Sequence, residues 1–214
     1  MPHLDDEDIS AYIKYPQYRK YTNKLYIAEL FGYKCGPAGV PVPCEGKYVV
    51  RPIMNLAGMS VGARVVTIKP DEIQKVPAGY FWVEYFEGKQ LSCDYVKESG
   101  KWKLLNAFEG RRDENNLVRF TKWIKQYYQV IPLPIELQKI NVDKLNVEMI
   151  VTDDHKHNIF EVHLRNGFDH LMQYKELIPV FKGETKRREG YKFVENKADG
   201  YGELLYPREG YLVR

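Results

Sequence analysis

Two glutamates lie in neighbouring segments that are each typical of a β-strand: Glu148 in NVEMIV and Glu161 in IFEVHLR. The polar residues between them predict a turn, so the two strands would pair antiparallel and bring both carboxylates to one face. Two carboxylates so near each other repel, and a cation between them relieves the repulsion. Magnesium is the natural candidate, because it takes oxygen ligands and bridges nucleotide phosphates. The alternative is that one glutamate faces solvent and has no function.

The elements that must position these residues are mostly short apolar strands. Helical periodicity predicts one amphipathic helix over residues 18–31, ending at Gly32, and another over residues 115–130, while residues 1–15 are expected to form a polar arm. Alternating or continuous apolar runs predict seven strands, over residues 47–53, 63–69, 79–86, 90–98, 102–110, 145–153 and 158–165. The pattern is two clusters of strands, each with a helix, joined near residue 84, which indicates the α+β class.

Composition narrows the class of protein. The 214 residues suit one compact unit or two lobes that share a cleft, and the net charge of +3 is too weak to indicate nucleic-acid binding by itself. No apolar run reaches the length of a membrane helix, and the acidic N-terminus does not resemble a secretory signal. The three cysteines, Cys35, Cys44 and Cys93, form no CxxC pair, so we expect a reducing, cytoplasmic location.

The strand-turn-strand segment LNVEMIVTDDHKHNIFEVHLR resembles the metal-binding hairpin of the ATP-grasp family, in which an acidic residue precedes an E-x-N motif. The resemblance implies that Glu148 and Glu161 are metal ligands. His163 falls where the family usually has Asn, which implies a third ligand, a phosphate contact, a shift toward Mn²⁺ or a structural histidine. Arg165 matches the E-x-N-x-R form, which implies that it steadies the transferred phosphoryl group.

Two further segments are similar to the phosphate-binding parts of that family. In KYVVRPIMNLAGMSVGA, Arg51 stands where a strand usually ends in Lys, and guanidinium keeps the charge. The loop residues Gly58, Ser60 and Gly62 would let backbone N–H groups approach the phosphates. Lys24, in Asn-Lys-Leu, resembles a lysine that reaches the phosphates. Taken alone, the loop is equally well explained as a hairpin turn and Lys24 as a surface lysine.

The segment FWVEYFEGKQLSCDYV resembles the hinge between the two ATP-grasp lobes. The resemblance implies that Glu84, Tyr85 and Phe86 contact adenine. Gln90 replaces the glutamate that usually holds the ribose, so ribose binding would be weaker or made differently. A buried strand followed by a turn at Gly88 accounts for the apolar residues here but not for Glu84.

Together these motifs imply an α+β ATP-grasp fold of two lobes with a nucleotide cleft between them. The resemblance covers residues 22–170. We therefore expect an N-terminal arm over residues 1–21, an N-terminal lobe over 22–84, a C-terminal lobe over 85–181 and a C-terminal extension over 182–214.

The implied reaction is ligation, in which ATP and Mg²⁺ (or Mn²⁺) convert a carboxylate into an acyl phosphate that an amine attacks. Two departures bear on it: Asn146 stands where many ligases have Arg, and little sequence precedes residue 22. The second suggests a small stand-alone core, a large acceptor such as a protein, or a partner subunit. The partners that we expect are a small-molecule, protein or peptide acceptor and either a partner subunit or further copies of the chain in a homo-oligomer. The alternatives are a kinase, a nucleotide sensor suggested by the substitutions at Arg51, Gln90 and His163, and a nucleic-acid-binding protein that uses the Tyr- and Lys-rich N-terminal segment.

Overall fold

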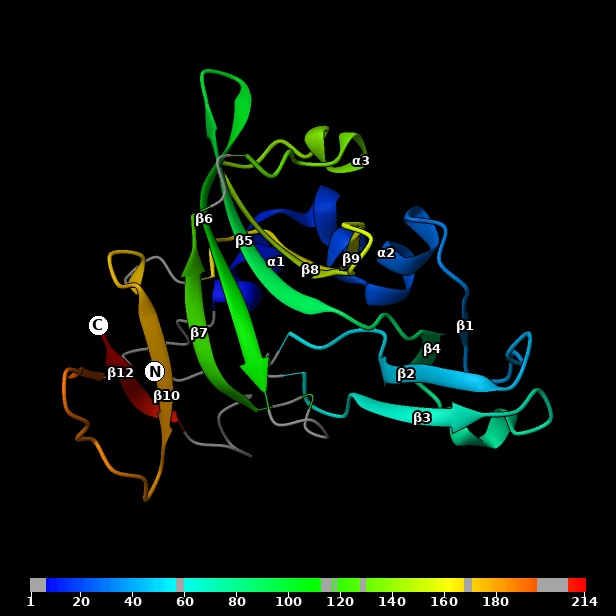
Figure 1. The fold of residues 1–214 in the computed structure, drawn as a ribbon. Coiled ribbons are helices and arrows are strands. Elements are labelled where there is room, and N and C mark those ends of the chain that lie inside the picture. Colours follow the sequence, from blue (N-terminus) through cyan, green and yellow to red (C-terminus); the bar gives the residue numbers. More distant parts are fainter. Residues whose placement is uncertain are drawn as a thin grey trace.

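The computed structural model of the chain describes residues 7–56, 60–112, 117, 119–127, 130–167, 171–195 and 208–214. It is an α+β structure with two antiparallel sheets and short helices (Figure 1), which confirms the predicted class. Within this described part, no helix is both long and apolar enough to cross a membrane.

The smaller sheet has four strands in the order β1-β4-β2-β3. They are β1 (Cys35–Pro37), β2 (Gly46–Pro52), β3 (Arg64–Ile68) and β4 (Tyr80–Glu84), and every neighbouring pair is antiparallel. Strands β2 and β3 form the predicted hairpin. Tyr48, Val50 and Trp82 pack on one face of the sheet with Ile68, so alternate side chains of β2 are buried.

The larger sheet has eight strands in the order β11-β12-β10-β7-β6-β5-β8-β9, again all antiparallel. Its strands are β5 (Lys89–Glu98), β6 (Lys101–Arg112), β7 (Phe120–Gln126), β8 (Lys144–Val151), β9 (His157–His163), β10 (Glu176–Phe181), β11 (Lys192–Glu195) and β12 (Arg208–Val213). The chain passes from the small sheet to the large one between Glu84 and Lys89. In Figure 1 the small sheet lies below and to the right of the long strands β5 and β6.

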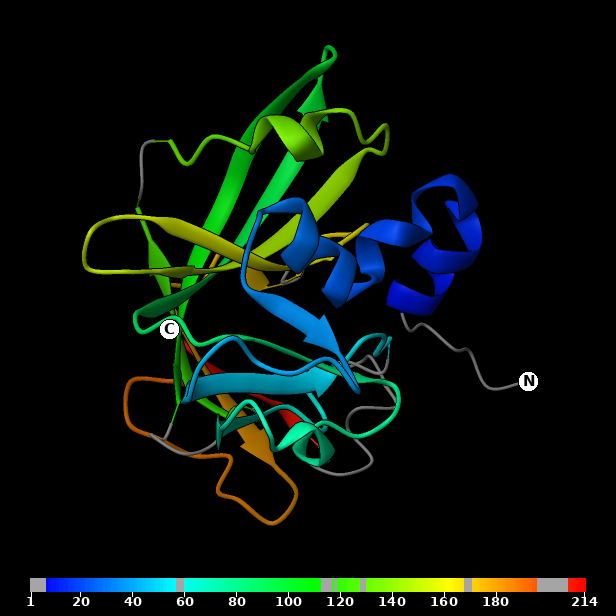
Figure 2. The same ribbon diagram turned by 90° about the vertical axis from the view of Figure 1, so that its right-hand side faces the viewer.

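Helices cover one face of the large sheet. They are α1 (Glu7–Lys14), the 3-10 helix Pro16–Thr22, α2 (Lys24–Leu30) and α3 (Ile135–Gln138), and a further 3-10 turn, Ile73–Lys75, follows β3 (Figure 2). Their apolar residues join those of β5, β8 and β9 in the main core. That core includes Ala11, Tyr21, Ile27, Leu137, Leu91, Cys93, Tyr95, Val147, Met149 and Val162.

The opposite face of β5, β8 and β9 is polar, because successive side chains of a strand point to opposite faces. Gln90, Ser92 and Asp94 alternate along β5 with the apolar residues of the core, and all three are buried. Asn146 and Glu148 of β8 lie opposite Asp94 and Ser92. This polar face positions the candidate site.

The predicted helix over residues 115–130 is wrong, since the described part of that segment contains β7. Its backbone pairs with β6 on one side and β10 on the other. Phe120 and Trp123 stack over Gly110 of β6, where an added Cβ would come within 2.5 Å of the Phe120 ring. Pairing on both sides and this aromatic packing outweigh a helical pattern of apolar residues.

The N-terminal region also differs from the prediction. Part of the expected polar arm forms helix α1, with Asp8 and Ala11 buried. The single helix expected over residues 18–31 is interrupted at Asn23, whose side chain accepts a 2.9 Å hydrogen bond from the backbone N–H of Tyr26. Asn is among the preferred N-cap residues, so a new helix begins at Lys24.

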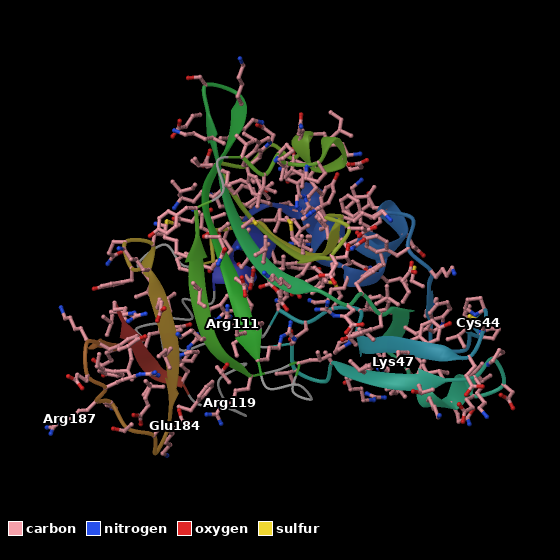
Figure 3. The ribbon with its side chains drawn as sticks, in the orientation of Figure 1. Cys44, Lys47, Arg111, Arg119, Glu184 and Arg187 are labelled. Carbon is pink, nitrogen blue, oxygen red and sulfur yellow. The ribbon has the colours of Figure 1, made fainter. Side chains whose placement is uncertain are left out.

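The segment predicted as a C-terminal extension supplies β11 and β12 to the large sheet. Strand β12 lies between β10 and β11, and Arg119, just before β7, forms an ion pair with Glu184, just after β10 (Figure 3). Glu176 of β10 accepts hydrogen bonds from Arg214 (2.7 Å) and from the hydroxyl of Tyr191, and forms an ion pair with Lys122 (3.1 Å). These bonds lower the pKa of Glu176 from 4.5 to about 2.

Glu176→Gln is expected to destabilise the protein by only about 1 kcal/mol at pH 7, because solvent screens ion pairs near the surface. The folded-state pKa lies below the unfolded one, so the carboxylate's contribution is present above about pH 4.5 and is lost as the pH falls toward 2. Urea unfolding at pH 7 and pH 3 measures this. The gap between wild type and variant should shrink at pH 3, and a constant gap would contradict the assignment.

Candidate functional site

A cleft of about 690 Å³, including space open to solvent, is lined by residues of both sheets and of α2. Apolar side chains form much of its wall, among them Val49, Phe81, Val83, Ile150 and Phe160. Its cations are Lys24, Arg51 and Arg112. A ligand that matches this lining carries an apolar, flat part and an anionic part.

The predicted hinge residues lie along one side of this cleft, immediately after β4. Glu84 accepts a 2.7 Å hydrogen bond from the backbone N–H of Lys34, so its carboxylate fixes the chain entering β1. Phe86 packs edge-on against Tyr33, with ring centroids 4.9 Å apart, while Tyr85 is 39% exposed. Burial raises the pKa of Tyr33, which also lines the cleft, to about 12. The hinge therefore offers aromatic surface to a ligand.

The glycine-containing loop is only partly described. Ser60 lines the cleft and has a positive φ of 48°, and its carbonyl accepts a hydrogen bond from Ala63 across a tight turn. Gly62 does not line the cleft; it has a φ of 82°, and a Cβ there would lie 2.5 Å from the Tyr80 hydroxyl. Glycine is required there by backbone conformation and by Tyr80. Gly58 lies outside the described residues.

Three predicted residues from distant parts of the chain meet in one buried cluster. Lys24 Nζ of α2 lies 2.9 Å from Glu161 Oε1, and Arg51 Nη2 of β2 lies 2.5 Å from Glu161 Oε2. Burial alone would raise the pKa of Glu161, but Lys24 and Arg51 outweigh it and hold the pKa well below its usual range. Glu161 is therefore ionised and joins α2, the small sheet and the large sheet.

Glu148 stands directly opposite Glu161 on the adjacent strand, as the sequence predicted. The register shifts just beyond this pair, so Phe160 is an extra residue that turns toward the cleft. Gln90 Nε2 donates a 2.8 Å hydrogen bond to Glu148 Oε2. Burial, and then the charge of Glu161, raise the pKa of Glu148. The two carboxylates thus differ, one neutralised by cations and one held by an amide.

The donor set suits magnesium. Among the described residues, no group of three or more His, Cys, Asp or Glu side chains is arranged to hold a metal ion. Mg²⁺ is usually bound through one or two carboxylates together with substrate phosphates, and dedicated all-protein cages are uncommon for it. Glu148 and Glu161 lie beside a cleft whose cationic side chains are suited to contact phosphate oxygens, and this arrangement fits that pattern.

His163 and Arg165 both bind Asp8 of helix α1. Asp8 Oδ1 lies 2.9 Å from His163 Nδ1, and Asp8 Oδ2 accepts a 2.6 Å hydrogen bond from Arg165 Nη2. His163 Nε2 is 3.5 Å from Glu161 Oε1. Burial would lower the pKa of His163, but Asp8 outweighs burial and raises it. His163 therefore links α1 to the glutamate pair, and neither it nor Arg165 lines the cleft.

Asp8→Asn is expected to lower the free energy of unfolding by about 2–4 kcal/mol, since it removes the counter-charge from two largely buried cationic groups. Urea denaturation measures the change. Asp71→Asn, at an exposed position, is the matched control and should shift stability by less than about 0.5 kcal/mol. Equal stabilities for the two variants would show that the Asp8 ion pairs do not hold α1 in place.

Asn146, which departs from the family pattern, belongs to a buried polar network. Its Nδ2 lies 2.8 Å from both Ser92 Oγ and Asp94 Oδ1, and the N–H of Gly167 donates a 2.7 Å hydrogen bond to Asp94. A Cβ added at Gly167 would lie 2.9 Å from Asn146 Nδ2, so the backbone of Gly167 approaches this amide closely. Through its amide, Asn146 ties β8 to β5 on the polar face of the large sheet.

The structure adds Arg112 to the predicted cleft residues. It is the last residue of β6 and is partly buried. No motif in the sequence marked it, because the pattern that follows it predicted a helix. Its distance along the chain from the other cleft residues left no local signal to connect it with them.

No sequence profile of a known family matches the chain, and no curated protein sequence matches it. Several solved structures, however, are similar to the chain in fold. An L-amino acid ligase from Bacillus licheniformis has a TM-score of 0.62 at 12% identity, over 91% of this chain and 66% of the ligase. N5-carboxyaminoimidazole synthetase from Staphylococcus aureus, complexed with ADP, has a TM-score of 0.61 at 12% identity, over 93% of this chain and 68% of that one.

A protein from Archaeoglobus fulgidus assigned to the ATP-grasp superfamily has a TM-score of 0.53 at 13% identity, over 92% of this chain and 65% of that protein. The chain thus spans about two thirds of the length of the solved structures to which it is similar. At these identities the likeness concerns the fold.

Proposed function

Because the chain has the ATP-grasp fold, we propose that it binds ATP with Mg²⁺ in the cleft between its two sheets and uses them to activate a carboxylate for attack by an amine. The observation that carries the proposal is the cluster of Lys24, Arg51 and Glu161 beside Glu148. The similar solved structures include a ligase and a synthetase complexed with ADP, which supports the choice of ATP.

The lining of the cleft supports a nucleotide. The aromatic and aliphatic wall next to the hinge suits an adenine ring, and the hinge backbone after Glu84 offers hydrogen-bonding groups. Also in the cleft lining, Arg51 Nε is buried without a hydrogen-bond partner among the described residues, and so is Gln90 Oε1. A buried donor on a cation suits a phosphate oxygen, and a buried carbonyl oxygen suits a ligand hydroxyl such as that of ribose.

The chain's own residues supply the positioning. Lys24 and Arg51 neutralise Glu161 in the ligand-free protein, and we propose that they turn to the phosphates when the nucleotide enters. Gln90 orients Glu148 through its amide. Glu148 and Glu161 are the residues that would hold Mg²⁺, whose charge would offset the negative charge that develops during phosphoryl transfer.

We assign His163 and Arg165 a place beside the glutamate pair, where Asp8 holds both side chains. Through its 3.5 Å approach to Glu161, His163 is suited to orient that carboxylate or to contact a phosphate. Arg165 is the residue that we propose steadies the transferred phosphoryl group. The loop that includes Ser60 is suited to close over the phosphates and exclude water, which protects a hydrolysable acyl phosphate.

Thermal unfolding with Mg²⁺ alone, ATP alone, and both together tests the binding step. A ligand at a hundredfold excess over its dissociation constant stabilises the folded state by about 2.7 kcal/mol, or roughly 5–10 °C for a chain of this size. We expect that rise only with ATP and metal together. A folded protein that shows no rise at saturating MgATP would refute the proposal.

ADP release in the presence of carboxylic acids and amines then tests the reaction class. A ligase requires both an acid and an amine for product, whereas a kinase requires only one acceptor. A protein that binds MgATP without releasing ADP under any of these conditions would be a nucleotide sensor.

A further inference from the structure

The three cations of the cleft differ in what neutralises them. Lys24 and Arg51 share the carboxylate of Glu161. Arg112, in contrast, forms no ion pair with any of the described residues. Its Nη1 donates a 2.8 Å hydrogen bond to the carbonyl of Leu117, and its guanidinium lies 4.5 Å from the centroid of the Phe120 ring. A neutral carbonyl and an aromatic face hold the group in place without cancelling its charge.

The surroundings of Arg112 make that charge costly. Burial lowers the pKa of Arg112 to about 10, against the opposing effect of the Glu148 charge, so the group is still cationic at neutral pH. Arg51 adds further repulsion, while Glu148 and Tyr85 offset it. Arg112 lines the cleft together with Tyr85 of the hinge, Arg51, and Gln90, whose amide holds Glu148. A partly buried cation without a carboxylate partner is typical of a site that receives an anion from a ligand.

We propose that Arg112 binds the phosphate groups of the nucleotide and makes the cleft prefer phosphorylated over unphosphorylated ligands. The inference rests on the proposed function and adds to it a third phosphate-binding cation, supplied by β6. Its planar fork of donors suits two phosphate oxygens at once, whereas Lys24 acts as a point charge.

Titration calorimetry of ADP with Mg²⁺ and of adenosine tests the inference, since both carry the base and the ribose but only ADP carries phosphates. In Arg112→Gln we expect ADP affinity to fall by about 10- to 100-fold and adenosine affinity to stay within about threefold, because one charge-assisted contact is removed. Arg112→Lys keeps the charge but loses the planar fork of donors, so its affinity for ADP should lie between those of Arg112→Gln and the wild type. If Arg112→Gln does not fold, an Arg112→Lys protein with the ADP affinity of the wild type would overturn the inference.

Arg111→Gln is the matched control, because the neighbouring side chain is 61% exposed and pairs with Glu109 outside the cleft lining (Figure 3). It should bind both ligands as the wild type does. If Arg112→Gln loses affinity for ADP and adenosine equally, Arg112 maintains the shape of the cleft and does not bind phosphate. If its ADP affinity is unchanged, Arg112 does not contact the phosphates. Either result overturns the inference while the wild type still binds ADP. Failure of the wild type to bind ADP would instead refute the proposed function.

Discussion

Glu161→Gln is expected to lower ATP-dependent turnover strongly and also to destabilise the ligand-free protein. The carboxylate neutralises Lys24 and Arg51, whose side chains are only 5% and 6% exposed. Removing one partner of a buried ion pair leaves an uncompensated charge, which costs about 3–5 kcal/mol. Turnover should fall by at least about 100-fold, since charge developing on the transferred phosphoryl group loses a metal ligand.

Urea unfolding measures the stability of Glu161→Gln, and ADP release measures its turnover. Glu29→Gln, which lies on α2 at an exposed position, serves as a control for the loss of one negative charge and should behave as the wild type. A Glu161→Gln protein as stable as the wild type would mean that Lys24 and Arg51 do not depend on Glu161. Undiminished turnover would exclude Glu161 from the metal site.

Glu148→Gln should separate these two effects. Glu148 forms no ion pair with the described residues, and its one hydrogen bond there comes from the amide of Gln90. Glutamine has the same shape and keeps a carbonyl oxygen for that bond. We therefore expect the unfolding free energy to stay within about 0.5 kcal/mol of wild type, while the neutral amide, a weak ligand for Mg²⁺, lowers turnover by about 100- to 1,000-fold.

The same two assays decide this prediction, with a third measurement of MgATP-dependent stabilisation. The stabilisation by ATP and metal together should shrink in Glu148→Gln although the ligand-free protein is intact. If the variant retains full turnover, the metal is held by other groups. If it loses several kcal/mol of stability, Glu148 has a structural role that its single hydrogen bond does not reveal.

Local patterns were sufficient for β2, β3 and β4 of the small sheet and for the glutamate hairpin, but they did not predict β1. Strand alternation over residues 46–52 and 144–151 has period two and reports directly which side chains share a face. The turn between β8 and β9 is short, so it restricts the pairing of the two strands and brings Glu148 opposite Glu161. These features depend on residues close together in the chain, which is why the sequence predicts them.

Long-range packing decided the rest. Residues 120–126 form a strand because β6 and β10 pair with them on both sides, and no window of that segment contains its partners. Helix α1 joins the site because Asp8 meets His163 and Arg165 from the other end of the chain. Arg112 lines the cleft because the large sheet brings the end of β6 beside residues that are remote in sequence.

In the candidate site, too, local sequence predicts some features and tertiary packing decides the others. Its residue types could be proposed from short motifs, because a carboxylate suits a metal and a cation suits a phosphate wherever they occur. Which charges are already neutralised is a property of the folded chain alone: Glu161 meets Arg51 across 110 residues of sequence, while Arg112 meets only a carbonyl and a ring among the described residues. Charge compensation depends on distances of a few ångström, and only tertiary packing sets those distances.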